Sequence, residues 1–257
     1  MELGIRGKTA LVTGASMGIG KGIATALARE GVRLAVVARR RNLLEELQKE
    51  LGQKLVIIER DLMEEDSSEK IAQAALDGLG SVDILINNAG GSRKFTLESS
   101  EEQWEEALTL NFTRHRQLTH KLLPHMIARK WGRIINVASA HGLVASPFKS
   151  AYVAAKHGLV GLTKTVALET AGTGVTCNAI CPGYVLTPLV EKQIEDQSKG
   201  RNISREAAIN DVILERQPSK EFVKVDEIAA LAVFLAGDDA ASITGAAYSI
   251  DGGWTAQ

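Results

Sequence analysis

The chain has 257 residues, of which 45% are hydrophobic, so it can bury a large core and its length suits a single α/β domain. The net charge of −1 gives no electrostatic reason to bind nucleic acid or an anionic membrane. No run approaches the ~20 apolar residues of a membrane span, and residues 1–8 lack the apolar run of a signal peptide, so we expect a soluble, cytoplasmic protein.

Short apolar runs alternate with helical patterns along the chain. Strands are predicted at 8–13, 33–38, 55–59, 82–87, 133–139, 175–180 and 246–250. Helices are predicted at about 20–30, 41–51, 67–78, 101–129, 152–170 and 226–236. This alternation predicts βαβ units, and hence one domain over residues 1–257 with a doubly wound parallel seven-stranded sheet and helices on both faces.

Residues 184–225 break the alternation with a long insert rich in Glu, Lys and Gln. The insert follows the carboxyl end of a predicted strand, which is where ligands bind in open α/β sheets. We therefore expect a small helical lid over a substrate. A solvated pair of surface helices is the alternative.

The cysteines and histidines predict neither a disulfide nor a metal site. Cys177 and Cys181 are four residues apart along a predicted strand and its end. Their Cα atoms are then roughly 13 Å apart, too far for a disulfide, so we expect small core residues. The five histidines (115, 120, 125, 141 and 157) do not cluster with cysteines or carboxylates at ligand spacings.

A glycine-rich loop follows the first predicted strand and opens a helix, in the sequence Gly14-Ala15-Ser16-Met17-Gly18-Ile19-Gly20. Strand, loop and helix in this order form the context of a dinucleotide-binding loop. Gly14 permits the tight turn, Gly18 lets the backbone approach a phosphate, and Gly20 lets the helix pack closely on the strand. The free N–H groups of the helix then face a pyrophosphate. The loop predicts nucleotide binding in a Rossmann-type arrangement.

Three residues in the second half of the chain suit proton transfer at a carbonyl. Tyr152 and Lys156 are four residues apart on a predicted helix and therefore share a face, with Ser139 thirteen positions upstream. A neighbouring ammonium lowers a phenol pKa from its ordinary value of about 10. A tyrosine tuned in this way can give or take a proton while a hydride moves at the neighbouring carbon. Such a pair alone is more often an ordinary surface pair; the glycine loop makes it a candidate site.

With the glycine loop, Asn87-Asn88-Ala89-Gly90, Ser139 and Tyr152-x-x-x-Lys156 in order, the chain resembles the short-chain dehydrogenase/reductase family over nearly its whole length. The resemblance implies an NAD(P)-dependent oxidoreductase that interconverts a secondary alcohol and a ketone. Ser139 would hydrogen-bond the substrate oxygen, and Tyr152 would be the acid/base. Lys156 would lower the pKa of Tyr152 and hold the nicotinamide ribose, and Asn111 would hold a water in the proton relay.

The same resemblance implies which residues contact the cofactor. Asp61 and Leu62 would border the adenine, and Asn88 would also tie the central strands together. The full implied set is Gly14, Ser16, Met17, Gly18, Ile19, Gly20, Asp61, Leu62, Asn88, Ala89, Gly90, Tyr152, Lys156, Pro182, Gly183, Val185 and Thr187.

Within the family, the runs at 139–146, 181–183, 187–193 and 251–256 resemble the bacterial D-3-hydroxybutyrate dehydrogenases. His141, Lys149 and Gln193 match residues that hold the substrate carboxylate there, together with the candidate substrate contacts Ser139 and Tyr152. All three can donate to a carboxylate. The resemblance implies a small 3-hydroxy acid as substrate and, because the family usually forms tetramers, a homotetramer.

The cofactor site departs from the resembled subset. The second predicted strand ends in Arg39 and Arg40, with no acidic residue to receive the ribose hydroxyls of NAD. Arg39 is placed to pair with a 2′-phosphate, and Arg40 could stack on or near the adenine. We therefore expect NADP. The resembled dehydrogenases use NAD, and NAD remains open if the arginines only begin the next helix.

The substrate pocket also departs from the subset. Ser92, followed by Arg93 and Lys94, stands where those enzymes have a glutamine, and Tyr184 stands where they have a tryptophan. These changes predict a 3-hydroxy or 3-oxo acid longer than four carbons or bearing a second acidic group. In the alternative, Arg93 and Lys94 point to solvent.

Two other functions remain to be weighed. The first is a 3-oxoacyl-thioester (acyl carrier protein or CoA) reductase or a sugar-type reductase of the same family. Its basis is the set of basic residues in and around the insert, Lys192, Lys199, Arg201 and Arg205. The carboxylate-binding set suits a free acid better. The second is a regulatory protein that has lost catalysis, which would lack a member of the Ser, Tyr and Lys set; this chain has all three.

Overall fold

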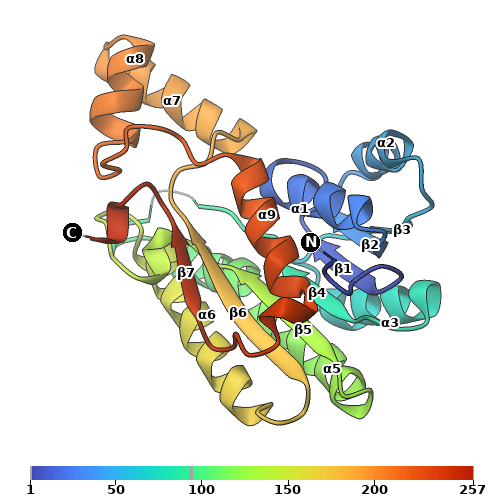
Figure 1. The fold of residues 1–257 in the computed structure, drawn as a ribbon. Coiled ribbons are helices and arrows are strands. Elements are labelled where there is room, and N and C mark those ends of the chain that lie inside the picture. Colours follow the sequence, from blue (N-terminus) through green and yellow to red (C-terminus); the bar gives the residue numbers. More distant parts are fainter. Residues whose placement is uncertain (1, 93–94, 257) are drawn as a thin grey trace.

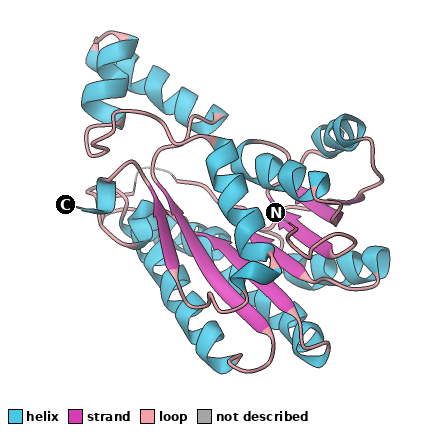
Figure 2. Cartoon of the chain, viewed as in Figure 1, coloured by secondary structure: helices cyan, strands magenta, loops and turns pink. Residues whose placement is uncertain are grey.

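The computed structural model describes residues 2–92 and 95–256 and contains a parallel sheet of seven strands in the order β3-β2-β1-β4-β5-β6-β7 (Figure 1). The strands are β1 (Thr9–Thr13), β2 (Arg33–Ala38), β3 (Val56–Glu59), β4 (Ile84–Asn87), β5 (Gly132–Val137), β6 (Val175–Pro182) and β7 (Ala247–Ile250). Figure 2 shows the helices packed around this sheet. The predicted doubly wound α/β fold and its seven strands are confirmed.

Helices cover both faces of the sheet. They are α1 (Gly18–Arg29), α2 (Arg41–Leu51), α3 (Ser67–Leu79), α4 (Glu101–Leu108), α5 (Arg114–Ala128), α6 (Ser150–Glu169), α7 (Pro188–Arg201), α8 (Arg205–Ala207) and α9 (Val225–Ala236). Successive strand residues point to opposite faces. Thus Ala10 and Val12 of β1 pack in a core with α1, α2 and α9, whereas Leu11 packs in a core with α3, α5 and α6.

The predicted helix at 101–129 is interrupted. A π-helical turn, Thr109–Thr113, separates α4 from α5. The buried side chain of Asn111 in this turn donates to the carbonyl of Ala107 at 2.9 Å and to that of Gly91 at 3.0 Å. π turns within helices occur frequently at functional sites. The contact with Gly91, twenty residues upstream, explains why helical periodicity did not reveal the interruption.

The insert at 184–225 contains α7, α8 and a π-helical turn, Ala208–Ile213, beyond the carboxyl ends of the strands (Figure 1). It has a small core of its own, made of Val190, Ile194, Ala208, Ile213 and Leu214. Its two ends meet where Val185 bridges Val223. The predicted helical content is confirmed; its action as a lid remains a prediction.

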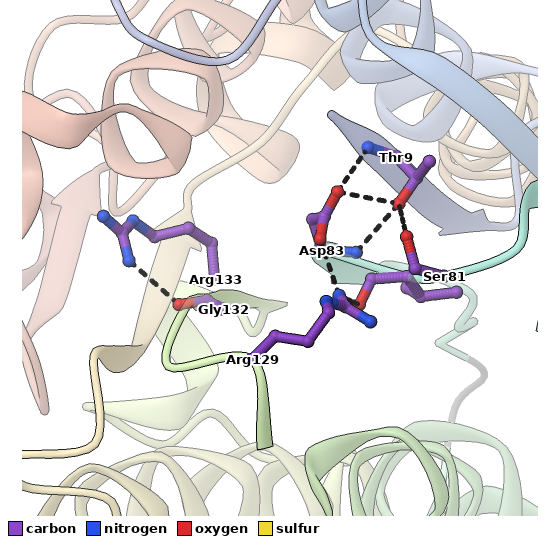
Figure 3. A network of polar contacts seen from close by, with 7 residues as sticks. Thr9, Ser81, Asp83, Arg129, Gly132 and Arg133 are labelled. Carbon is purple, nitrogen blue, oxygen red and sulfur yellow. Dashed lines mark hydrogen bonds and ion pairs between the residues drawn. The ribbon is translucent and has the colours of Figure 1, made fainter. Parts of the chain in front are cut away.

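The opposite end of the sheet is held by a polar network (Figure 3). One carboxylate oxygen of Asp83, on the segment entering β4, accepts from the backbone and hydroxyl of Thr9, each at 2.9 Å. The other accepts from Arg129 at 2.6 Å. These bonds join β1, the entrance to β4 and the end of α5, at the amino ends of the strands.

Cys177 and Cys181 are both buried and form no disulfide. Within the described residues, no helix has the length and apolar character that a membrane span requires.

Candidate active site

Ser139, Tyr152 and Lys156 lie together beyond the carboxyl end of β5. Ser139 begins a 3-10 turn, Ala140–Gly142, that packs against α6, and its hydroxyl is hydrogen-bonded to Tyr152. The ammonium of Lys156 lies 5.7 Å from the centre of the Tyr152 ring. It donates to the carbonyl of Val137 at 2.9 Å, at the end of β5. The helix therefore brings the three predicted side chains into one group.

Burial shifts the pKa values of Tyr152 and Lys156, and that of Tyr152 moves opposite to the expected direction. Desolvation raises the pKa of Tyr152 to about 12, although the hydrogen bond with Ser139 acts in the opposite direction. Burial lowers the pKa of Lys156 to about 8. The expected net lowering of the tyrosine pKa is wrong for this structure, because desolvation dominates. At neutral pH the phenol is therefore protonated beside a largely charged lysine.

Asn111 holds the turn that follows β4. Besides the two bonds donated by its amide nitrogen, its side-chain oxygen accepts from the backbone of Gly91 at 3.1 Å. A Cβ on Gly90 would lie 2.8 Å from that oxygen and 3.6 Å from the ammonium of Lys156, so the turn lies beside the candidate site. The relay water implied for Asn111 remains a proposal.

His115 is a residue that the sequence did not single out for the site. Its Nε2 lies 2.7 Å from the carbonyl oxygen of Ala89. Burial, with the charge of Lys156, lowers its pKa to about 3, so the ring is neutral and donates from Nε2. His115 thereby holds the same turn from α5. Its spacing from the other histidines carries no signal of this contact, which only the tertiary structure creates.

The glycine loop has the predicted backbone. Gly14 and Gly18 have φ of +67° and +55°, in the left-handed region that favours glycine. Asn88 donates to the carbonyl of Thr13 at 2.8 Å and so ties β4 to β1. A Cβ on Gly20 would lie 2.3 Å from the carbonyl oxygen of Gly14 and 2.4 Å from the amide nitrogen of Asn88. The close packing expected of Gly20 is confirmed, while Gly18 and Ile19 at the start of α1 are half-buried.

Gly20→Ala is expected to destabilise the protein by about 1–3 kcal/mol, because the new methyl group overlaps backbone that has little room to move. At about 2–4 °C per kcal/mol, thermal denaturation should show a midpoint lower by several degrees. Gly161→Ala, also in a helix, is the control because its Cβ would meet no atom within 4 Å. Equal midpoints for the two variants would contradict the close packing.

The end of β6 faces the glycine loop. A Cβ on Gly18 would lie 3.2 Å from the methyl carbon of Thr187, whose hydroxyl accepts from Val190 at the start of α7. The segment from Pro182 to Thr187, which includes Gly183 and Val185, therefore lies across from the loop. Ala89 lies beside the loop, since a Cβ on Gly14 would be 3.0 Å from its Cα, and Gly90 lies beside Lys156. The arrangement fits a dinucleotide along the carboxyl ends of the strands.

The predicted adenine end is a hollow of about 360 Å³ lined by Arg39, Glu59, Arg60, Asp61 and Glu64. Arg39 is 76% exposed, and its nearest guanidinium nitrogen is 3.8 Å from the carboxylate of Asp61. Arg40 donates to the sulfur of Met17 at 3.4 Å. The hollow thus combines the expected Arg39 and Asp61 with Glu59, Arg60 and Glu64, which the sequence did not single out.

The residues predicted for the substrate side form an aromatic and basic group. The ring of His141 meets that of Tyr152 edge-on at 5.9 Å and that of Trp254 at 4.9 Å. Tyr184 stacks on Trp254 at 5.5 Å with an interplanar angle of 11°. The ammonium of Lys149 lies 3.5 Å from the hydroxyl of Tyr184. Trp254, from the last turn of the described chain, is therefore part of this aromatic group.

His141 carries a buried nitrogen that no described residue hydrogen-bonds. Its Nδ1 is 3.5 Å from the hydroxyl of Ser139, whereas its Nε2 has no hydrogen-bond partner among residues 2–92 and 95–256. Burial, with the charges of Lys149 and Arg216, lowers its pKa to about 3. The ring is therefore neutral, and a proton on Nε2 would be free to meet a ligand.

Other predicted substrate residues are not gathered as closely. Gln193 is half-buried on α7, and within the described part of the chain it makes no hydrogen bond with His141 or Lys149. Ser92 is half-buried in the loop after β4. Arg93 and Lys94, expected to admit a larger or more anionic substrate, lie outside the described residues.

Comparisons with known proteins agree with this geometry. Residues 8–198 match the family model described as short chain dehydrogenase. The chain is 48% identical to the D-beta-hydroxybutyrate dehydrogenase of Rhizobium meliloti, over 97% of this chain and 99% of that protein. It is also 48% identical to the protein of the same name from Cupriavidus necator, over 98% and 100% of the two chains.

A solved structure shows the same fold in the family. The crystal structure of a variant actinorhodin polyketide ketoreductase with NADPH is 36% identical, with a TM-score of 0.90 over 98% of both chains. The glycine loop, the Ser139–Tyr152–Lys156 group and these matches together show that the chain belongs to the short-chain dehydrogenase family of NAD(P)-binding oxidoreductases.

Proposed function

We propose that the protein interconverts a small 3-hydroxy acid and the corresponding 3-oxo acid. The observation that carries this proposal is the buried Nε2 of His141, which has no partner in the described part of the chain and lies next to Ser139 with Lys149 nearby. A neutral N–H and an ammonium are both donors to a carboxylate. The same group lies against Tyr152, so an acid held there has its carbinol carbon near the phenol.

In the reductive direction, Ser139 donates to the substrate oxygen and stabilises the charge that develops there. Tyr152 gives its proton to that oxygen, since its raised pKa keeps it protonated at neutral pH. Lys156 supplies positive charge beside the phenolate that remains. Bound NAD(P), which the glycine loop and the end of β6 would hold, supplies or accepts the hydride.

The test is the absorbance at 340 nm of purified protein mixed with D-3-hydroxybutyrate and either NAD or NADP. We expect reduction of the cofactor with the D acid and less than a tenth of that rate with its methyl ester. Equal rates with the acid and the ester would contradict a carboxylate-binding pocket. No reduction with any 3-hydroxy acid from four to six carbons would contradict the proposed substrate class.

We also propose that the pocket accepts acids longer than four carbons or with a second acidic group. A hollow of about 350 Å³, lined by Val144, Glu215, Arg216 and Trp254, adjoins the aromatic group and supports this extension.

The thioester reductase is the second candidate, and it is favoured by a 40% identical relative named as a putative ketoacyl reductase of granaticin polyketide synthase. Comparing kcat/KM for free acids and CoA thioesters separates the two.

For the cofactor we propose NADP, held through its 2′-phosphate by Arg39. The exposure of this guanidinium supports the proposal. The carboxylate of Asp61 in the same hollow favours the alternative, NAD, because it can accept hydrogen bonds from the ribose hydroxyls. Arg39→Ala should lower kcat/KM with NADP by about tenfold, the effect of losing a charge-assisted hydrogen bond. The value with NAD should stay within twofold. Equal losses with both cofactors would contradict the assignment.

The homotetramer and the cytoplasmic location are further proposals. The tetramer is proposed from the family to which the chain belongs, whose members usually form tetramers. Light scattering of the eluted protein in size-exclusion chromatography tests the tetramer, and a monomer would contradict it.

A further inference from the structure

Gln217 is a buried amide in the segment that returns from the insert to the sheet. Only 1% of its surface is exposed. Its side-chain oxygen accepts from the backbone of Tyr184 at 3.0 Å, and its side-chain nitrogen donates to the carbonyl of Glu221. Both ends of the amide are therefore used, and one of them holds the backbone of a residue in the substrate pocket.

The same side chain is wedged between two glycines. A Cβ on Gly183 would lie 2.5 Å from the side-chain oxygen of Gln217. A Cβ on Gly252, which has φ of +60°, would lie 2.8 Å from its Cγ. Gly183 ends the β6 segment just before Tyr184, and Gly252 lies in the turn just before Trp254. Gln217 therefore touches the backbones that carry both stacked rings.

The stacked rings of Tyr184 and Trp254 connect Gln217 to the polar groups of the pocket. Trp254 meets the edge of His141, and Tyr184 receives Lys149 at its hydroxyl. A shift of either ring would move the donors proposed for the carboxylate, whereas the glycine loop is held by other contacts. We infer that Gln217 is a positioning residue that sets the Tyr184–Trp254 stack and thereby the binding of the substrate acid. The part concerning the acid rests on the proposed function.

Backbone hydrogen bonds that do not involve Gln217 also hold the two ends of the insert. The backbone of Val223 donates to Tyr184 at 2.9 Å, and that of Gly183 donates to Ile250 at 3.0 Å. Ser219 donates to Gly252 at 3.1 Å. Because these backbone bonds do not involve the amide, variants of Gln217 should keep the fold and change the pocket locally.

Gln217→Glu provides the sharpest test, because a protonated carboxyl has an acceptor and a donor like the amide. An ionised one lacks the donor for the carbonyl of Glu221. Burial raises a carboxyl pKa above its ordinary value of about 4.3, to about 8–9 in the extreme, so KM is measured from about pH 5 to about pH 10. The ratio of variant to wild-type KM for 3-hydroxybutyrate should be near one at low pH and should rise at least tenfold as the carboxyl ionises at higher pH. The corresponding ratios for kcat and for the nucleotide KM should stay within threefold over the same pH range.

Two further variants control this experiment. Gln217→Met lacks both polar atoms, so it should raise the acid KM at every pH. Gln48→Met removes a comparable amide, which accepts from the backbone of Leu55 at 2.9 Å at the end of α2, and should leave the acid KM unchanged. A ratio for Gln217→Glu that is independent of pH, or an effect of Gln48→Met on the acid KM, would overturn the inference.

A readout without turnover separates this inference from the proposed function. The emission of Trp254 is obtained as the difference between a protein and its Trp254→Phe counterpart, which removes the contribution of Trp104 and Trp131. Acrylamide should quench this difference more strongly in Gln217→Met than in wild type, since the stack is loosened. Unchanged quenching with a lower denaturation midpoint would show a structural role only. If wild type turns over no hydroxy acid, the proposed function fails and the quenching still tests the stack.

Discussion

Tyr152→Phe is expected to lower kcat/KM by about 10³-fold, within the range measured for loss of a general acid or base. The change removes the hydroxyl that gives and takes the proton but keeps the ring that packs against His141 at 5.9 Å. The dissociation constant of the nucleotide, measured by fluorescence titration, should change by less than about threefold, because the glycine loop and Lys156 are untouched. The loss should therefore appear in kcat.

Tyr248→Phe is the matched control, since it removes a phenol hydroxyl from β7. It should leave kcat within twofold of wild type. Turnover by Tyr152→Phe within tenfold of wild type would remove Tyr152 from the proposed chemistry. Loss of nucleotide binding in that variant would show instead that its hydroxyl holds the cofactor site together.

Lys149→Met is expected to lower kcat/KM for the hydroxy acid by about 10- to 100-fold, the cost of a hydrogen bond to a charged group. The methionine keeps the length of the side chain near Tyr184 but cannot donate to a carboxylate. Burial lowers the pKa of Lys149. A bound carboxylate would favour the charged lysine and reverse this shift. Most of the effect should appear in KM.

The methyl ester of the acid tests the cause of this loss. It lacks the negative charge, so its low kcat/KM should change by less than about threefold in Lys149→Met. Lys164→Met, on an exposed part of α6, should change kcat/KM for neither substrate. Equal losses for the acid and the ester would show that Lys149 acts on the shape of the pocket and not on the charge of the substrate.

The sequence by itself determined the sheet, the glycine loop and the central group of residues. Each is encoded locally: apolar runs bounded by glycine predict buried parallel strands. Gly14, Gly18 and Gly20 supply conformations and space that other residues do not. Tyr152 and Lys156 share a helix face because they are four residues apart. The resemblance added His141 and Lys149, and the fold placed His141 against Trp254 and Lys149 against Tyr184.

Only the tertiary structure decided the features that depend on distant segments or on burial. The amide of Asn111 in the π turn bonds Gly91, Trp254 reaches the pocket from the turn after β7, and Gln217 of the insert holds the backbone of Tyr184. The pKa of Tyr152 rises because desolvation exceeds the effect of nearby donors, and spacing along a helix does not report desolvation. Likewise, Asp61 meets Arg39 across two neighbouring strands, so the charge around the cofactor follows from strand pairing, which local sequence patterns do not specify.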